Sequence, residues 1–267
     1  MMKHTVFFNQ GVMIGIICII GLLSACGKKQ STTQNTDDAN IIGTKSIQVA
    51  VNSNMPPFAY IDDKGNPIGF DVEVITHIAQ KNGYTVKFNI LPWQDMFKSV
   101  EQNISDLAIS SISYTTEREG KYLLSNPYVY MPAGVLSLND TTINSMSDLK
   151  PMRLGVQDGA IFVDVAKEHG IEHVVAKEKM FLSFQDLING KVDAIMSDKQ
   201  IVQHFAKSYP QYKTNLLEYG NVNDKGSYAV AIAPKNKTQI INMFNQGLSD
   251  MRATGELTKL EEKWFEK

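Results

Sequence analysis

Cysteine is nearly missing from this chain of 267 residues, which contains only Cys18 and Cys26. Both lie near the N-terminus, so we expect neither a disulfide framework nor a cysteine-ligated metal site in the rest of the chain. Histidine gives no metal motif either. His169 and His173 are four residues apart, but Gly170 and a strand-like continuation interrupt the helical spacing. The sequence therefore predicts no metal ion and no cofactor.

A long basic run is also missing, and the formal net charge is only −2. This excludes the electrostatic footprint that a nucleic-acid-binding protein needs. What the chain does have is 43% apolar and 20% charged residues, typical of a globular protein. A chain of this length can build two lobes, each with its own core.

The N-terminal segment has the features of an export signal. Lys3 precedes an apolar stretch over residues 12–23 that is short for a spanning helix and suits a secretory signal peptide. Leu23-Ser24-Ala25-Cys26 then resembles the lipobox of bacterial lipoproteins, which implies cleavage before Cys26 and its lipidation. An uncleaved anchor or a chance cleavage site is the alternative. We predict a signal peptide over residues 1–25 and a flexible tether over the polar residues 26–45.

From Ser46 onward, short apolar runs alternate with helical spacing, and the pattern starts afresh near residue 150. This alternation predicts an α/β fold with two mainly parallel sheets and flanking helices. The expected strands are 47–51, 85–90, 107–109, 153–156, 171–175 and 194–196. The expected helices are 72–81, 93–100, 160–169, 181–189, 201–207, a stripe over 240–251 and a final helix over 257–264.

A stretch from Asp106 to Arg118 combines a buried strand, several hydroxyl residues and a helix start. Thr116 followed by Glu119 predicts a capping box, which places Arg118 in the first helical turn. Neighbouring glutamates can compensate this cation. The alternative is functional: a guanidinium binds a carboxylate through two parallel hydrogen bonds, and the hydroxyls of Ser111 and Ser113 supply further donors. Such a set of groups is a receptor for an α-carboxylate.

This stretch closely resembles the ligand motif of the family 3 extracellular solute-binding proteins, the amino-acid-binding subunits of bacterial importers. Further landmarks follow in the order that the family uses: Pro56-Pro57-Phe58, Gly69-Phe70-Asp71, Trp93, Pro127-Tyr128, Leu154-Gly155-Val156, Val192-Asp193-Ala194 with Asp198, and Met251-Arg252-Ala253-Thr254-Gly255. The resemblance implies a two-lobed, type II periplasmic-binding-protein fold with two crossover strands. Lobe 1 would comprise residues 46–131 and 228–267, and lobe 2 residues 132–227, with ligand bound between the hinged lobes.

The resemblance also implies roles for individual residues. Arg118 matches the carboxylate clamp, and Ser111 and Ser113 match positions that receive polar groups of the ligand. Asp198 matches the partner of the α-ammonium; its alternative is the N-cap of a helix beginning near Ile201. Trp93 matches an apolar wall of the pocket, with core packing as its alternative.

Two positions depart from the family pattern. Met55 stands where an aromatic residue often stacks on the ligand, and a thioether can line the same apolar face. Ala160 and Ile161 replace the usual Thr or Ser that contacts the carboxylate. Helix N-terminal amides near Ile161 can bind an anion without side-chain help.

The side chain of the ligand is expected to face Asn52, Met55, Trp93 and Gln157, a set without formal charge. An enclosed charge would lack a partner there, so the set predicts a neutral amino acid with an apolar or amide side chain. A loop shift that brought the Asp158 carboxylate to the pocket would add a charge to this set and change the prediction.

The sequence thus predicts a monomeric, lipid-anchored amino-acid-binding protein that faces the periplasm or the cell exterior. It would deliver its ligand to an ABC permease whose ATPase is a separate chain, because no Gly-rich phosphate loop with Gly-Lys-Ser/Thr is present. We expect no enzyme activity. The alternatives are a cyclohexadienyl dehydratase-like enzyme, which has the same fold and uses an added carboxyl group as acid, and a non-transport sensor, although no output domain is attached.

Overall fold

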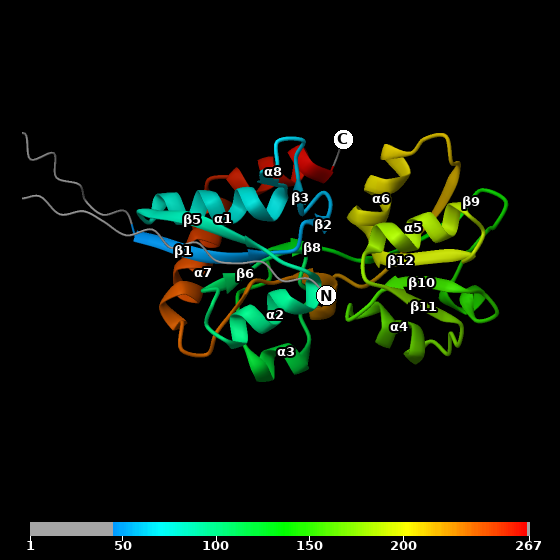
Figure 1. Ribbon diagram of the computed structural model, residues 1–267, viewed down its shortest axis with the longest axis horizontal. Coiled ribbons are helices and arrows are strands. Elements are labelled where there is room, and N and C mark those ends of the chain that lie inside the picture. Colours follow the sequence, from blue (N-terminus) through cyan, green and yellow to red (C-terminus); the bar gives the residue numbers. More distant parts are fainter. Residues whose placement is uncertain (1–44, 266–267) are drawn as a thin grey trace, which may run out of the picture. The chain divides into compact units, whose positions relative to one another are not determined.

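The computed structural model describes residues 45–265 (Figure 1). The predicted signal peptide, Cys26 and the predicted tether up to residue 44 lie outside these residues. None of the helices within them is both long and apolar enough to span a bilayer.

The first sheet has five strands in the order β5-β1-β6-β15-β7. β1 pairs in parallel with β5 and β6, whereas β15 runs antiparallel to both β6 and β7. The strands are β1 (Lys45–Val51), β5 (Tyr84–Ile90), β6 (Leu107–Ala108), β7 (Leu123–Leu124) and β15 (Ile232–Ala233). The helices that go with this sheet are α1 (Phe70–Lys81), α2 (Trp93–Glu101), α3 (Thr116–Lys121), α7 (Thr238–Ala253) and α8 (Glu256–Phe265).

The second sheet also has five strands, in the order β11-β10-β12-β9-β13. β10 pairs in parallel with β11 and β12, and β9 runs antiparallel to β12 and β13. The strands are β9 (Ala133–Leu138), β10 (Leu154–Gln157), β11 (Val174–Lys177), β12 (Ala194–Asp198) and β13 (Thr214–Tyr219). The helices that go with it are α4 (Phe162–Glu168), α5 (Met180–Ile188) and α6 (Lys199–Ser208).

Short elements complete the fold. A small sheet contains β2 (Asn54–Met55), β3 (Ala59–Ile61) and β4 (Pro67–Ile68), and 3₁₀ turns lie at Met146–Leu149 and Lys225–Ser227. β8 (Val129–Tyr130) pairs with β14 (Tyr228–Ala229), so the two segments that connect the sheets lie side by side.

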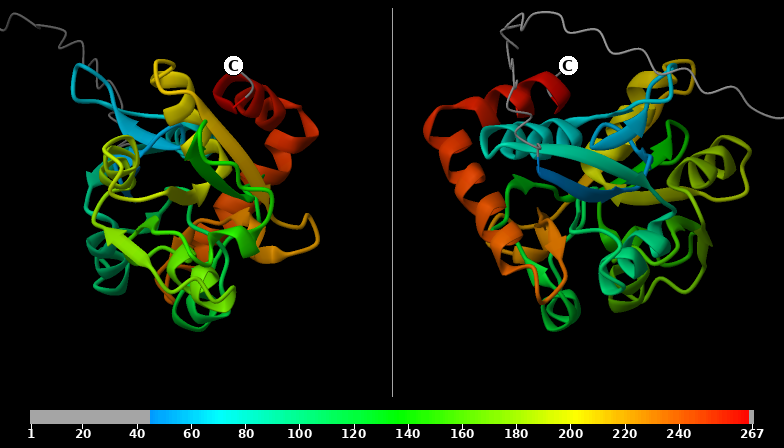
Figure 2. Two further views of the ribbon diagram at one scale, coloured as in Figure 1. Left: turned by 90° about the vertical axis from the view of Figure 1, so that its right-hand side faces the viewer. Right: turned by 60° about the vertical axis from the view of Figure 1, so that its left-hand side comes forward.

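Helices α7 and α8 pack against each other and against α1, as the orange, red and cyan ribbons of Figure 2 show. The approach of α7 to α1 depends on Gly247, because a Cβ atom there would lie 2.6 Å from a side-chain carbon of Ile78. Ile78 belongs to the fully buried stripe Val74, Ile75 and Ile78 of α1, which has the spacing of a core-facing helical face.

The two-lobed α/β fold class is confirmed. Each sheet is mainly parallel, with one reversed strand, β15 or β9, which follows a connection between the sheets and runs antiparallel to its neighbours. β13 was not expected, since Thr214–Tyr219 lies at a sheet edge and its polar and apolar residues do not alternate. The strand expected at 171–175 lies at Val174–Lys177 instead.

Candidate functional site

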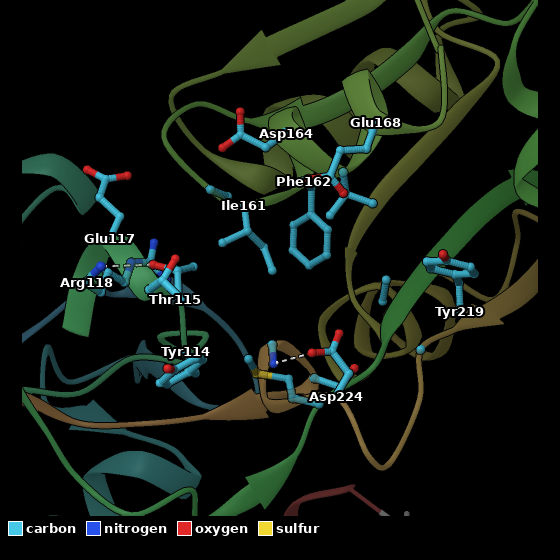
Figure 3. A pocket seen from close by; sticks show the side chains of 18 of the residues that line it. Tyr114, Thr115, Glu117, Arg118, Ile161, Phe162, Asp164, Glu168, Tyr219 and Asp224 are labelled. Carbon is cyan, nitrogen blue, oxygen red and sulfur yellow. Dashed lines mark hydrogen bonds between the residues drawn. The ribbon is translucent and has the colours of Figure 1, made fainter. Parts of the chain in front are cut away.

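A cavity of about 440 Å³ lies where the loops of the two sheets meet. The start of α3, with Thr115 and Arg118, lies opposite Ile161 and Phe162 at the start of α4 (Figure 3). Arg118 is the one Arg or Lys among the lining residues, whereas the carboxylates there are Glu117, Asp164, Glu168 and Asp224.

A second cavity of about 220 Å³ is lined by Asn52, Trp93 and Glu178, among others. The Trp93 indole Nε1 donates a hydrogen bond of 3.0 Å to the carbonyl of Gly159, a residue that lines the larger cavity. Trp93 therefore lies at the junction of the two cavities, with only 6% of its surface exposed.

Arg118 lies in the first turn of α3 as predicted, but the capping residue is Thr115 rather than Thr116. The Thr115 hydroxyl accepts the Arg118 backbone N–H at 3.1 Å. Glu119 does not complete a capping box, because its carboxylate accepts the hydroxyl of Tyr114 at 2.7 Å. Both adjacent threonines are suitable N-cap residues. Thr115 is the cap because its backbone is extended, as an N-cap residue requires.

The Arg118 guanidinium is held without an acidic partner. Its Nη1 donates to the Ser113 carbonyl at 2.7 Å, and its planar group lies 5.1 Å from the ring centre of Phe97. No carboxylate of the described residues lies within ion-pair distance, and Glu117 pairs with Lys121 instead. Glu117 still favours the charged form of Arg118 without forming an ion pair with it. Burial lowers the pKa of Arg118 to about 10, and Asp198 is the main charge that opposes this shift.

Asp198 ends β12 and directly precedes α6, so its backbone occupies the N-cap position. Its side chain makes no capping hydrogen bond, and one carboxylate oxygen has no partner among the described residues. The residue is only 2% exposed. Burial raises the pKa of Asp198 to about 8, because the opposing effects of Ser111 and Arg118 do not offset the loss of hydration.

Ser111 lies near two acidic side chains, Asp71 and Asp198, and has an unusual backbone conformation. Its φ angle is +44°, a left-handed value that non-glycine residues rarely adopt. Its backbone N–H donates to Asp71 Oδ2 at 2.7 Å, while its buried hydroxyl has no properly aligned partner among the described residues. That hydroxyl is near enough to Asp198 to favour the ionised carboxylate.

The residues predicted to face the ligand's side chain have mixed surroundings. Asn52 Nδ2 donates to the Leu91 carbonyl at 3.1 Å, and its Oδ1 accepts the Asn54 N–H at 3.1 Å. Gln157 Nε2 makes only a 3.4 Å contact with the Glu178 carbonyl, and its Oε1 has no partner among the described residues.

Met55 and Ile161 complete the predicted set. Met55 is 3% exposed, belongs to the main core and lines neither cavity. Ile161 lines the larger cavity from the residue just before α4, with its side chain half-buried.

Buried polar atoms without a hydrogen-bond partner are costly and therefore informative. Within the described part of the chain they belong to Ser111, Gln157, Asp198, Gln200 and Trp264. Three of these five residues were predicted to bind ligand from the sequence alone. In the same residues no group of three or more His, Cys, Asp or Glu is arranged to hold a metal ion.

Asp71 was predicted only as part of a family landmark, not as a site residue. It is fully buried at the start of α1, where its Oδ1 accepts the Tyr128 hydroxyl at 2.8 Å. Gly69 permits this placement: its φ is +131°, and an added Cβ would lie 2.2 Å from the Phe58 carbonyl oxygen. The Gly-Phe-Asp sequence was the available signal, but nothing in it indicates which distant amide Asp71 binds.

The fold and the site define a two-lobed solute-binding protein of the periplasmic type. The model of the bacterial extracellular solute-binding proteins, family 3, matches residues 47–267, and the chain belongs to this family.

Among its relatives is the arginine-binding extracellular protein ArtP of Bacillus subtilis (strain 168). It is 27% identical over 251 residues, covering 93% of this chain and 94% of that protein. A probable histidine-binding protein of Neisseria gonorrhoeae is 27% identical over 263 residues, covering 97% of this chain and 96% of that protein. The structure of an ancestral arginine-binding protein bound to arginine is similar with a TM-score of 0.74 and 26% identity, over 82% of this chain and 98% of that one.

Proposed function

We propose that this chain binds an amino acid between its two lobes and delivers it to an ABC-type importer. One observation carries the proposal: a buried carboxylate, Asp198, and a largely buried guanidinium, Arg118, each lack an ion-pair partner among the described residues. An α-amino acid carries the two complementary charges on adjacent groups. Its ammonium would pair with Asp198 and its carboxylate with Arg118.

Hydroxyl groups and apolar surfaces would complete the site. The unpartnered hydroxyl of Ser111 would bind the ligand's polar atoms, and Ser113 would both hold Arg118 through its carbonyl and contribute its hydroxyl. Trp93 and Ile161 would supply apolar walls, with Met55 supporting them from the core. Binding in a desolvated site makes each of these charge pairs stronger than it would be in water.

The proposed ligands include more amino acids than the neutral ones predicted from the sequence. The predicted set of Asn52, Trp93 and Gln157 contains no carboxylate, yet Glu178 and Lys179 line the smaller cavity beside Asn52 and Trp93. The names of the arginine- and histidine-binding relatives support including cationic amino acids. We therefore propose that both neutral and cationic amino acids are candidates.

Location and partners follow from the family and the N-terminal sequence. We propose that residues 1–25 direct export and are removed, and that lipidation of Cys26 anchors the chain to a membrane, facing the periplasm or cell exterior. The permease and the ATPase would be separate chains, and the protein would act as a monomer. We propose lobe boundaries at 131/132 and 227/228; the pairing of β8 with β14, which brings the two connecting segments together, supports them.

One observation favours an enzymatic alternative. The raised pKa of Asp198, about 8, means that this carboxyl carries a proton near neutral pH in the ligand-free protein, as a general acid must. In a dehydratase, such a proton would be transferred to a leaving hydroxyl group. We propose the binding role, and incubation with prephenate or arogenate should then give no product. Sustained product formation would establish the dehydratase class.

The decisive test of the binding role is calorimetric titration of the purified protein with each of the twenty L-amino acids. We expect saturable one-to-one binding of at least one of them. Heat signals at the level of buffer dilution for all twenty would rule the proposal out.

A further inference from the structure

Two buried carboxylates lie on either side of Ser111. Asp71 comes from the start of α1 and binds the Ser111 backbone N–H at 2.7 Å. Asp198 comes from the end of β12 in the other sheet and is affected by the Ser111 hydroxyl. Both carboxylates have at most 2% of their surface exposed. One serine therefore binds one acidic group through its backbone N–H and has its side-chain hydroxyl near a second acidic group from the other sheet.

The left-handed backbone of Ser111 depends on this arrangement. A non-glycine residue in this conformation costs about 1–3 kcal/mol and persists only where its surroundings enforce it. The short hydrogen bond to Asp71 is the contact that holds the Ser111 amide in this orientation. Asp71 is fixed in turn by a hydrogen bond from the Tyr128 hydroxyl. The Tyr128 ring stacks on Phe70 at an interplanar angle of 19°.

The charges around Asp198 are few. Arg118 favours its ionised form, and Asp71 opposes it. Tyr128 faces both carboxylates, and burial keeps its own pKa well above the ordinary value, so it stays neutral. Burial also raises the pKa of Asp71, to about 7, against the effect of its two hydrogen bonds. The net charge next to the proposed ammonium site thus depends on both carboxylates.

We propose that Asp71 is a positioning residue of the ligand site, which fixes the Ser111 hydroxyl beside Asp198 and controls when Asp198 carries a charge. This inference rests on the proposed function for its consequence in binding. While Asp71 is ionised, Asp198 keeps its proton to higher pH, because two like charges in one desolvated region repel each other. The ligand's ammonium relieves this repulsion, so binding of an amino acid releases a proton from Asp198.

The test is a carbon-13 NMR titration of the aspartate carboxyl groups in the ligand-free, full-length protein. We compare the wild type with Asp71→Asn, which keeps an acceptor for the Ser111 N–H but removes the charge. The Asp198 midpoint should fall by about half a pH unit or more in this variant. Asp186→Asn is the matched control, because Asp186 is also nearly buried on a helix but pairs with Lys177 and Lys191. An unchanged Asp198 midpoint in Asp71→Asn would overturn the proposal.

A reciprocal variant covers the case in which Asp71→Asn fails to fold. In Asp198→Asn, the Asp71 midpoint should also fall, because coupling between two sites is mutual. An Asp71 midpoint that stays at its wild-type value there would contradict the coupling.

The binding readout is the pH profile of affinity for whichever of the twenty L-amino acids binds the wild type most tightly. In Asp71→Asn the rise of affinity with pH should begin at lower pH than in the wild type. Identical profiles would overturn the role of Asp71 in binding. If no amino acid binds the wild type, the proposed function fails, whereas the NMR titration still decides whether Asp71 acts on Asp198.

Discussion

The indole Nε1 of Trp93 donates a hydrogen bond of 3.0 Å to the carbonyl of Gly159, joining the start of α2 to the loop after β10. These elements belong to different sheets, so this bond forms only when the two sheets approach each other around the site. Position 159 favours glycine, because its φ is +70° and an added Cβ would lie 2.5 Å from the Gln94 amide. Trp93 therefore links the two sheets through this donor, and it would also supply the apolar wall proposed above.

Replacing Trp93 with Phe should keep the wall and remove the donor. Loss of a hydrogen bond of this type costs about 0.5–1.5 kcal/mol, so we expect ligand affinity to fall about 2- to 10-fold, with faster dissociation. Stopped-flow fluorescence and calorimetry measure both quantities. Trp264→Phe is the matched control, because the Trp264 Nε1 has no partner among the described residues. Equal losses in the two variants would show that the Gly159 bond does not stabilise the bound state.

Replacing Asp198 with Asn should weaken binding of amino acids much more than binding of analogues without an ammonium group. The carboxylate supplies the charge that pairs with the ammonium, and an amide keeps the shape without the charge. Calorimetry with an L-amino acid and with its deaminated acid measures the two affinities. Equal losses for both compounds would mean that Asp198 has only a structural role at the start of α6.

The pH dependence of stability should identify Asp198 in the ligand-free protein. Its folded-state pKa, about 8, exceeds the ordinary value of 3.8. Between these values the native state binds more protons than the unfolded state, so this group's contribution to stability is full below about pH 4 and is lost as pH rises through about 8.

In Asp198→Asn the decline of Tm between pH 5 and 8.5 should therefore be shallower than in the wild type. Circular dichroism melts across this range measure it. Asp193→Asn is the control, because Arg153 lowers the pKa of Asp193 and its contribution changes at acidic pH instead. Parallel Tm curves for wild type and Asp198→Asn would contradict the raised pKa.

The Cys26→Ser variant should release the otherwise folded protein from membranes. The polar residues 28–44 have no apolar face of their own to hold the chain at a bilayer. Membrane fractionation of cells that express each form provides the measurement. A variant that still partitions with membranes would mean that residues 12–23 remain as an uncleaved anchor.

Most of the fold was predictable because apolar periodicity reports burial. The α1 stripe of Val74, Ile75 and Ile78 follows helical spacing, and it packs as that spacing requires. Prediction failed where burial is weak. The edge strand Thr214–Tyr219 has no buried residue, and its pairing with β9 comes from backbone contacts that leave little trace in the sequence.

The sequence predicts candidate site residues only where they belong to a recognisable motif. Arg118 and Asp198 were selected from the sequence, but their environment depends on long-range contacts. The choice of Thr115 over Thr116 as helix cap depends on one backbone conformation, and the bond from Ser111 to Asp71 joins residues 40 positions apart. Such contacts are set by the tertiary packing of distant segments, which no local pattern records.

Titration of Arg118→Ala with the wild type's tightest-binding L-amino acid shows whether this guanidinium holds the ligand's carboxylate. Removing the partner of a buried carboxylate costs about 2–5 kcal/mol, so affinity should fall between about 30-fold and several thousand-fold while the circular dichroism spectrum stays unchanged. Arg153→Ala, which removes a surface arginine paired with Asp193, should bind as the wild type does. Near-native affinity of Arg118→Ala would contradict the account, because the ligand's carboxylate would then be held elsewhere.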